Sequence, residues 1–236
     1  MSKKTRMLGI LGGMGPLASA EFLRTLYALH ISELEQDAPP CVLLSDPSIP
    51  DRTRAILEGS TDELLARLSR ALEDLSSLGA DRIVIACVTV HHVLPRVPEP
   101  LRRKVISLID LVIDEVLAVP EPYLLLATTG TRTARIFEQH ERWGEIERWI
   151  VLPDGGEQRE LHERLYFLKR EEPDEALLVW LEELASGHEA GGVIFGCTEL
   201  HLLQRLLARN PGRFSGKRIV DPLLTVARNF KALLGS

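Results

Sequence analysis

A short apolar run that stops abruptly at a cysteine constrains the fold of this chain most strongly. Val193-Ile194-Phe195 ends at Gly196-Cys197-Thr198-Glu199, and a helical pattern follows through Leu203. A continuous apolar run of this length is typical of a buried parallel strand, and the polar tip after it is typical of a turn into a helix. Cys197 is therefore expected at the carboxyl end of a strand, where open α/β sheets build their sites. The alternative is a structural cysteine, because free cysteines are often buried.

The same pattern occurs a second time, earlier in the chain. Ile83–Ala86 is an apolar run that leads into Cys87, Thr89 and His91. The two cysteines lie 110 positions apart (197 minus 87) in a chain of 236 residues, and each has a histidine four positions later. Two thiols at matching strand ends are expected to face one cleft. A helix N-terminus beside each thiol is expected to lower its pKa.

Strand–turn–helix units account for the rest of the chain. Met7–Leu11 predicts a strand that enters a glycine turn and a helix over Leu17–Glu35, and Tyr123–Ala127 predicts a strand that enters a polar turn and a helix ending near Glu141. Further strands are expected at Cys41–Leu44, Val105–Leu108, Trp149–Leu152 and Arg218–Val220, and further helices at Thr61–Leu78, Ile109–Ala118, Glu157–Lys169, Pro173–Ser186 and Pro222–Leu233.

This succession predicts an α/β protein with two similar domains, each a mostly parallel sheet flanked by helices, related by pseudo-two-fold symmetry. We place the first domain at residues 1–101 plus 215–236 and the second at residues 102–214. The final helix is expected to return to the first domain.

Composition excludes several classes of protein. The net charge of −6 lacks the basic footprint of a nucleic-acid-binding protein. Three cysteines form no even disulfide framework, which favours a reducing compartment. The first apolar run is broken by glycines and is too short for a leader or a membrane span. We therefore expect a cytoplasmic protein with a small-molecule partner, no nucleic acid and no membrane.

Two loops are candidates for binding an anion. The glycine turn over residues 12–15 can bring backbone N–H groups to an anion at a helix N-terminus, although it does not fit the dinucleotide fingerprint. A tight turn without a ligand is the alternative. In the proline-rich loop over residues 45–54, Arg52 can clamp a carboxylate, whereas Arg54 is expected to be solvated.

Two opposed thiols permit three kinds of chemistry. The first is cofactor-independent proton transfer, in which one thiolate removes a proton from one face of a carbon and the opposite thiol donates one to the other face. The second is a zinc site formed by Cys87, His91, Cys197 and His201. We expect no metal, because the spacing fits no compact zinc finger and these side chains need not converge. The third is a non-catalytic small-anion-binding module that uses the glycine turn and Arg52.

Four short motifs then follow one another over most of the chain: Gly12–Pro16, Pro50–Thr53, Thr129–Thr131 and Gly196–Glu199. In this order they resemble the aspartate/glutamate racemase family, in its aspartate racemase branch. The resemblance implies two α/β domains with the active site in the cleft between them, no pyridoxal phosphate or other cofactor, and a homodimer. It also implies an amino-acid racemase or epimerase that acts at the α-carbon of an acidic, aspartate- or glutamate-like substrate.

The resemblance assigns roles to individual residues. Cys87 and Cys197 match the paired base and acid of the family. Arg52 and Lys169 match basic residues that hold the substrate's carboxylates. The positions that match residues lining the site are Met14, Thr89, Thr131 and Thr198, and Glu199 is placed with them.

One position departs from the family pattern. The family usually reads Cys-Asn-Thr-Ala-His at its first cysteine, whereas this chain reads Cys87-Val88-Thr89-Val90-His91. The asparagine amide helps to hold the substrate in those relatives, and a valine side chain can neither donate nor accept a hydrogen bond. We therefore expect ordinary aspartate to bind poorly, or a more apolar substituent to lie beside Val88. A divergent isomerase or decarboxylase that acts on a non-amino-acid carboxylate is the alternative.

Overall fold

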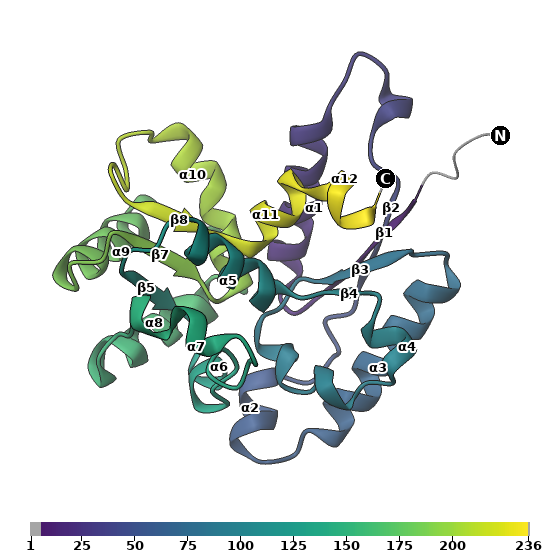
Figure 1. Ribbon diagram of the computed structural model, residues 1–236, viewed down its shortest axis with the longest axis horizontal. Helices are drawn as coiled ribbons and strands as arrows, with labels where there is room; N and C mark the ends of the chain where they lie inside the picture. Colours follow the sequence, from purple (N-terminus) through teal and green to yellow (C-terminus); the bar gives the residue numbers. More distant parts are fainter. Residues whose placement is uncertain (1–5, 236) are drawn as a thin grey trace.

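The computed structural model describes residues 6–235 and contains two four-stranded parallel sheets (Figure 1). The N-terminal sheet has the strand order β2 (Cys41–Ser45), β1 (Leu8–Gly12), β3 (Arg82–Ile85) and β4 (Val105–Ile106). The C-terminal sheet has the order β6 (Ile150–Val151), β5 (Tyr123–Leu126), β7 (Gly192–Phe195) and β8 (Arg218–Val220). The two orders correspond strand for strand, which confirms the predicted fold class.

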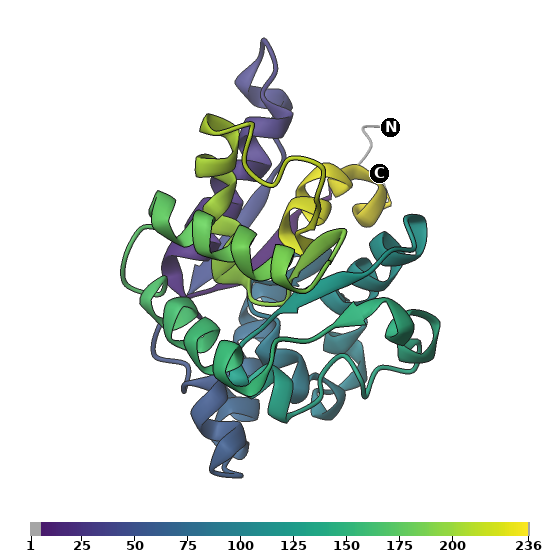
Figure 2. The ribbon, with the colours of Figure 1, turned by 90° about the vertical axis from the view of Figure 1, so that its left-hand side faces the viewer.

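The longer helices form three layers around the two sheets. Between the sheets lie α1 (Pro16–His30), α5 (Leu108–Ala118) and α11 (Pro222–Arg228), whose apolar side chains share one core with both sheets. The outer face of the N-terminal sheet is covered by α3 (Asp62–Ser77). The outer face of the C-terminal sheet is covered by α8 (Gly155–Phe167) and α9 (Glu175–Gly187), which Figure 2 shows in green at the front.

The remaining elements are short. They are the α-helices α2 (Arg52–Leu57), α4 (Glu99–Arg102), α6 (Thr129–Thr133), α7 (Trp143–Ile146), α10 (Gln204–Arg209) and α12 (Phe230–Leu234), and the 3₁₀ helices η1 (Glu35–Asp37), η2 (Thr89–His92), η3 (Leu94–Arg96), η4 (Glu147–Trp149) and η5 (Thr198–Leu203).

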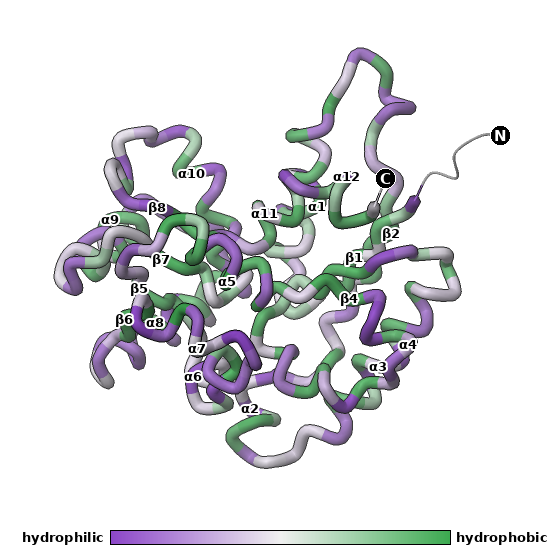
Figure 3. Tube along the Cα trace, in the orientation of Figure 1, coloured by the Kyte–Doolittle hydropathy of each residue, from purple (hydrophilic) through white to green (hydrophobic). Residues whose placement is uncertain are grey.

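Burial explains why the strands are apolar runs and the outer helices are amphipathic. All residues of β5 and β7 are buried, as parallel strands covered on both faces require. On α3, Leu64, Leu68, Leu72 and Leu75 have no exposed surface and form one stripe. Burying each of these leucines contributes about 2 kcal/mol. Figure 3 shows the same division, with hydrophobic segments along the central strands and hydrophilic segments on the outer helices.

Several helices differ from their predicted bounds. The first helix ends at His30 and not at Glu35, and α6 ends at Thr133, far short of Glu141. Arg135 has a φ of 50°, a left-handed conformation that a continuing helix cannot adopt. The predicted loop around Arg52 contains a helix, α2, because the Asp51 side chain accepts a hydrogen bond from Arg54 N at 2.9 Å and caps its first turn.

Strand pairing differs from the predicted domain boundaries. Val105 and Ile106 of β4 pair with β3, so this strand belongs to the N-terminal sheet, whereas the prediction began the second domain at residue 102. Similarly, β8 pairs with β7 and belongs to the C-terminal sheet, although the prediction returned the chain to the first domain at residue 215. The last helices do return, because α11 packs against α1. Within residues 6–235, no helix combines the length and the apolar character needed to cross a membrane.

Candidate active site

A small cavity lies where the carboxyl ends of the two sheets meet. Its volume is ≈ 10 Å³, about the room that one water molecule needs. The side chains that line it are Met14, Arg52, Thr53, Cys87, Val88, Thr89, Thr128, Lys169, Cys197, Thr198 and Glu199. The structure therefore brings together every residue predicted for the site except Thr131, which lies behind the wall.

Cys197 follows β7 and is 4% exposed. Its Sγ donates a hydrogen bond to Oε2 of Glu199 at 2.8 Å, and Oε1 of the same carboxylate accepts from the backbone N–H of Gly15 at 3.0 Å. Burial and the negative charge of Glu199 raise the pKa of the Cys197 thiol well above its usual value. The predicted lowering of this pKa by a helix N-terminus is therefore wrong. The helical segment after Cys197 is a 3₁₀ turn, and the adjacent carboxylate and the burial outweigh its dipole.

Cys87 follows β3 and is 5% exposed. The cation near it is Arg52, the first residue of α2, which is 7% exposed. Its Nη2 donates to the Met14 carbonyl at 2.9 Å and its Nη1 donates to the Pro50 carbonyl at 3.1 Å, while its Nε is buried without a hydrogen-bond partner. Burial by itself would lower the pKa of Arg52, but the charges of Cys87, Asp51 and Glu199 raise it. This guanidinium is thus held as a fixed positive charge at the cavity.

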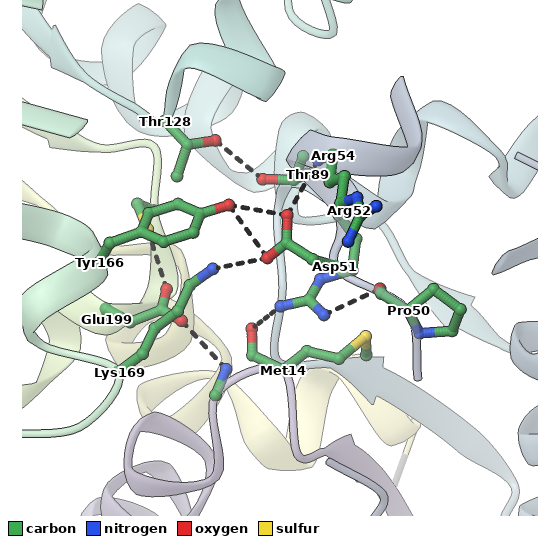
Figure 4. A network of polar contacts seen from close by, with 12 residues as sticks. Met14, Pro50, Asp51, Arg52, Arg54, Thr89, Thr128, Tyr166, Lys169 and Glu199 are labelled. Carbon is green, nitrogen blue, oxygen red and sulfur yellow. Dashed lines mark hydrogen bonds and ion pairs between the residues drawn. The ribbon is translucent and has the colours of Figure 1, made fainter. Parts of the chain in front are cut away.

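Lys169 reaches the cavity from the chain after α8 and pairs with a carboxylate of the other sheet (Figure 4). Its Nζ lies 3.2 Å from Oδ2 of Asp51 and 3.4 Å from the centroid of the Tyr166 ring. The Tyr166 hydroxyl also donates to Asp51, at 2.8 Å from Oδ1. Burial opposes the charged form of Lys169, yet the Asp51 carboxylate raises its pKa. The Asp51 carboxylate is therefore paired with Lys169, the cation that was predicted to hold a substrate carboxylate.

Threonine hydroxyls join the two sheets around the cavity. Oγ1 of Thr89 lies 3.1 Å from Oγ1 of Thr128 and 2.9 Å from Oγ1 of Thr131. Oγ1 of Thr198 donates to the carbonyl of Ala86 at 2.9 Å. Each contact crosses from one sheet to the other, so these residues fix how the two cysteine loops face each other.

The two histidines have structural partners and do not complete a metal site. Nδ1 of His91 lies 3.1 Å from the Cys87 carbonyl, and its Nε2 accepts from the Leu108 N–H at 3.4 Å. Burial lowers the pKa of His91 to about 4, so the ring is neutral. His201 instead places Nδ1 2.6 Å from Oδ2 of Asp221. In the described part of the chain, no three potential metal-binding side chains form a cluster, and each histidine instead anchors the turn that follows its cysteine.

Four residues at this site were not predicted from the sequence. Thr53 and Thr128 line the cavity, and Asp51 and Tyr166 form the contact with Lys169. Tyr166 precedes Lys169 by three positions within the helix predicted over Glu157–Lys169, and that spacing, which places both on one face of a helix, was the available signal. Arg54 agrees with its prediction, because it is exposed and pairs with Glu58.

Comparison with known proteins places this fold among racemases. The profile of the Asp/Glu/hydantoin racemase family matches residues 11–229. The structure is similar to Picrophilus torridus aspartate racemase, with a TM-score of 0.78 and 25% identity over 98% of this chain and 94% of that one. An aspartate racemase homologue from Pyrococcus horikoshii OT3 gives 0.68 and 23% over 98% and 100%. Glutamate racemase from Campylobacter jejuni subsp. jejuni shares the fold, with a TM-score of 0.60 and 16% identity over 96% and 85%.

The chain belongs to the Asp/Glu/hydantoin racemase family. It is a racemase and thus an isomerase, and its family supports an amino acid as the small-molecule substrate.

Proposed function

We propose that this protein is a cofactor-independent amino-acid racemase in which Cys87 and Cys197 are the base and the acid. The observation that carries the proposal is that both thiols line one small cavity together with the cations Arg52 and Lys169. A thiol is well suited to this role, because its pKa is closer to neutrality than that of any hydroxyl. Two thiols contributed by two opposed sheets can serve the two faces of one carbon.

The chemistry requires a stabilised carbanion. When one thiolate removes the α-proton, negative charge develops on the α-carbon and its carboxylate. A fixed guanidinium such as Arg52 lowers the cost of that charge, since it is already oriented and buried. The second thiol then donates a proton to the opposite face, which inverts the centre. Burial of both thiols keeps bulk water away from the intermediate.

The cations favour an acidic substrate of the aspartate or glutamate type. An α-carboxylate can use the unpartnered Nε of Arg52, and a side-chain carboxylate can replace Asp51 at Lys169. The cavity must enlarge to admit such a molecule, and release of the contact between Asp51 and Lys169 would separate the two sheets at this edge. Val88 is 1% exposed and adds an apolar wall beside Cys87, which favours a substrate or a pose with an apolar group there.

The test is loss of racemisation in Cys87→Ser and in Cys197→Ser. Each change should lower the rate by about 10²–10⁴-fold, because a serine hydroxyl is a far weaker acid than a thiol. Deuterium incorporation at the α-carbon should be screened over L- and D-amino acids and dicarboxylic acids. Cys41→Ser is the matched control, because Cys41 lies in β2 and is absent from the cavity lining.

The outcomes separate the alternatives. If either cysteine variant racemises at the wild-type rate in both directions, the two-thiol mechanism is wrong. Proton exchange on carboxylates other than amino acids would favour the divergent isomerase or decarboxylase, and binding without turnover would favour the anion-binding module. The proposal also includes a homodimer and a cytoplasmic location. Light scattering of the purified protein tests the dimer, and turnover after dialysis against a chelator tests independence from metals.

A further inference from the structure

The two thiols of the cavity have unlike neighbours. The residue two positions after Cys87 is Thr89, a neutral hydroxyl, whereas the residue two positions after Cys197 is Glu199, a carboxylate. Glu199 is 3% exposed, and both of its oxygens accept hydrogen bonds, one from Gly15 N–H and one from the Cys197 thiol. A carboxylate that accepts on both oxygens is held in place and directs its charge at Cys197.

The other charged groups around Cys197 are directed elsewhere. Lys169 also faces this thiol and weakly favours its thiolate, but the ammonium pairs with Asp51. The two outer nitrogens of Arg52 donate hydrogen bonds to the backbone carbonyls of Pro50 and Met14. The group in direct contact with the Cys197 sulfur is therefore an anion, and an anion opposes ionisation of the thiol beside it.

We propose that Glu199 holds the proton on Cys197, so that the ligand-free enzyme starts each cycle with Cys197 as the acid and Cys87 as the base. The roles of acid and base rest on the proposed function, whereas the protonation of the Cys197 thiol by itself does not. Glu199 is thus a positioning residue that acts through Cys197. From the sequence, Glu199 was predicted only as one of the residues that line the substrate site.

The proposal makes the two directions of reaction unequal. In the direct course, the Cys87 thiolate takes the α-proton and becomes a thiol, and Cys197 gives its proton to the other face and becomes a thiolate. That product state places the new thiolate beside the Glu199 carboxylate, so two like charges share a buried site. Cys197 then regains a proton from solvent and Cys87 loses one to solvent, which restores the starting state. The opposite enantiomer requires the disfavoured state from the outset.

The experiment follows the ionisation of Cys197 without any substrate. In Cys41→Ser/Cys87→Ser, Cys197 is the remaining thiol of a chain with three cysteines, and its thiolate is read from ultraviolet absorbance as the pH rises. We expect the midpoint above the ordinary value of 9.0. Adding Glu199→Gln should lower this midpoint by about one pH unit or more, because glutamine keeps an acceptor for Gly15 but removes the charge.

The matched control is Glu21→Gln in the same background. Glu21 is also 3% exposed, but it pairs with Arg24 and Arg205 and is absent from the cavity lining, so it should leave the midpoint unchanged. An unchanged midpoint in the Glu199→Gln protein would overturn the proposal.

Circular dichroism checks the fold of each variant. If the Glu199→Gln protein does not fold, the protein with Glu199 intact still decides whether Cys197 starts as the acid, because a midpoint at or below 9.0 overturns the proposal and a higher one supports a protonated Cys197 thiol. Racemisation measured separately distinguishes the two claims. If the wild-type protein does not racemise any substrate but Cys197 titrates as expected, the proposed function is refuted, while the claim that Glu199 keeps Cys197 protonated still holds.

Discussion

The loops that carry the two cysteines have the same backbone plan and exchange contacts in the same way. Two positions after each cysteine, a side chain crosses to the helix that follows the first strand, in chain order, of the other sheet. Thr89 contacts Thr131 of α6, and Glu199 contacts Gly15, which caps α1. The placement is therefore symmetric while the chemistry is not, because one contact is neutral and the other is charged. A repeated motif predicts where side chains lie but leaves open which charge they meet.

The histidines four positions after the cysteines extend this comparison. His91 accepts from the N–H of Leu108, the first residue of α5, and His201 contacts Asp221, which caps α11. Each histidine thus anchors its loop to the helix after the last strand of its own sheet. The C-terminal sheet does so with a buried carboxylate, and the N-terminal sheet does so with a backbone N–H only.

The largest expected effect comes from removing that carboxylate. Asp221 is 3% exposed and accepts from His201, from Gln204 at 2.8 Å and from the Leu223 N–H at 3.0 Å. Asp221→Asn places an amide where two donors need an acceptor, and should lower the free energy of unfolding by about 3–5 kcal/mol. Urea denaturation measures this loss.

The corresponding cap of the other sheet supplies the control. Ser107 accepts from the Asp110 N–H at 3.1 Å and caps α5, so Ser107→Ala should cost only about 1 kcal/mol. Equal losses in the two variants would show that the carboxylate adds nothing beyond a cap.

The contact between His201 and Asp221 also makes the free energy of unfolding depend on pH. Burial would raise the pKa of Asp221, but His201 and the other donors lower it below the ordinary 3.8. An acid whose pKa is lower in the folded state stabilises the fold above its unfolded pKa, and this contribution is lost as the pH falls through its folded pKa. The stability difference between wild type and Asp221→Asn should therefore be constant at neutral pH and shrink as the pH falls below about 4. A difference that grows toward acid pH would contradict this assignment.

Arg52 and Lys169 offer a comparison between a cation held by carbonyls and one held by a carboxylate. Arg52→Ala should lower kcat/KM by tenfold or more, about 1.4 kcal/mol or above, because Arg52 is a buried cation that acts on Cys87. Steady-state kinetics on the best substrate from the deuterium screen measures the loss. Arg54→Ala is the matched control and should leave kcat/KM unchanged, since Arg54 is exposed and pairs with Glu58. Unchanged kinetics in Arg52→Ala would remove Arg52 from the site.

The residue directly after each cysteine is a second difference between the two loops. Thr198 donates across to Ala86, whereas Val88 has no group to donate. Thr198→Val makes the two loops alike, and should cost about 1 kcal/mol of unfolding free energy because it leaves a buried carbonyl without its partner. Thr198→Ser keeps the hydroxyl and should recover most of that loss. No difference between the two variants would mean that the contact does not hold the loops together.

The smallest expected effect concerns substrate choice at Val88. Val88→Asn adds an amide to the cavity wall, and one hydrogen bond worth about 1 kcal/mol should raise kcat/KM for aspartate or glutamate about fivefold. Val88→Ala is the control: it enlarges the cavity but adds no amide, so it distinguishes an effect of cavity volume from an effect of the new hydrogen bond. A gain in the alanine variant alone would show that volume limits the substrate, and no gain in either would show that the pocket differs at further positions.

Local patterns were sufficient for most of the fold. The apolar runs before Cys87 and Cys197 predict buried strands because a strand covered on both faces needs apolar residues throughout, and the leucine stripe of α3 predicts one buried helix face. Both signals come from neighbours in the sequence, so they survive without tertiary information. The bounds of α6 and the membership of β4 and β8 were missed, because they depend on which distant strand offers a partner.

The sequence by itself determined that two cysteines end two buried strands and that basic residues accompany them. The tertiary structure decided which charge each thiol meets. Glu199 lies two residues from Cys197 in the chain, yet its carboxylate is oriented by Gly15, 184 positions away, and Asp51 reaches Lys169 over 118 positions. A thiol's pKa depends on burial and on charges within a few ångströms, and in this protein those charges are positioned by contacts between the two sheets.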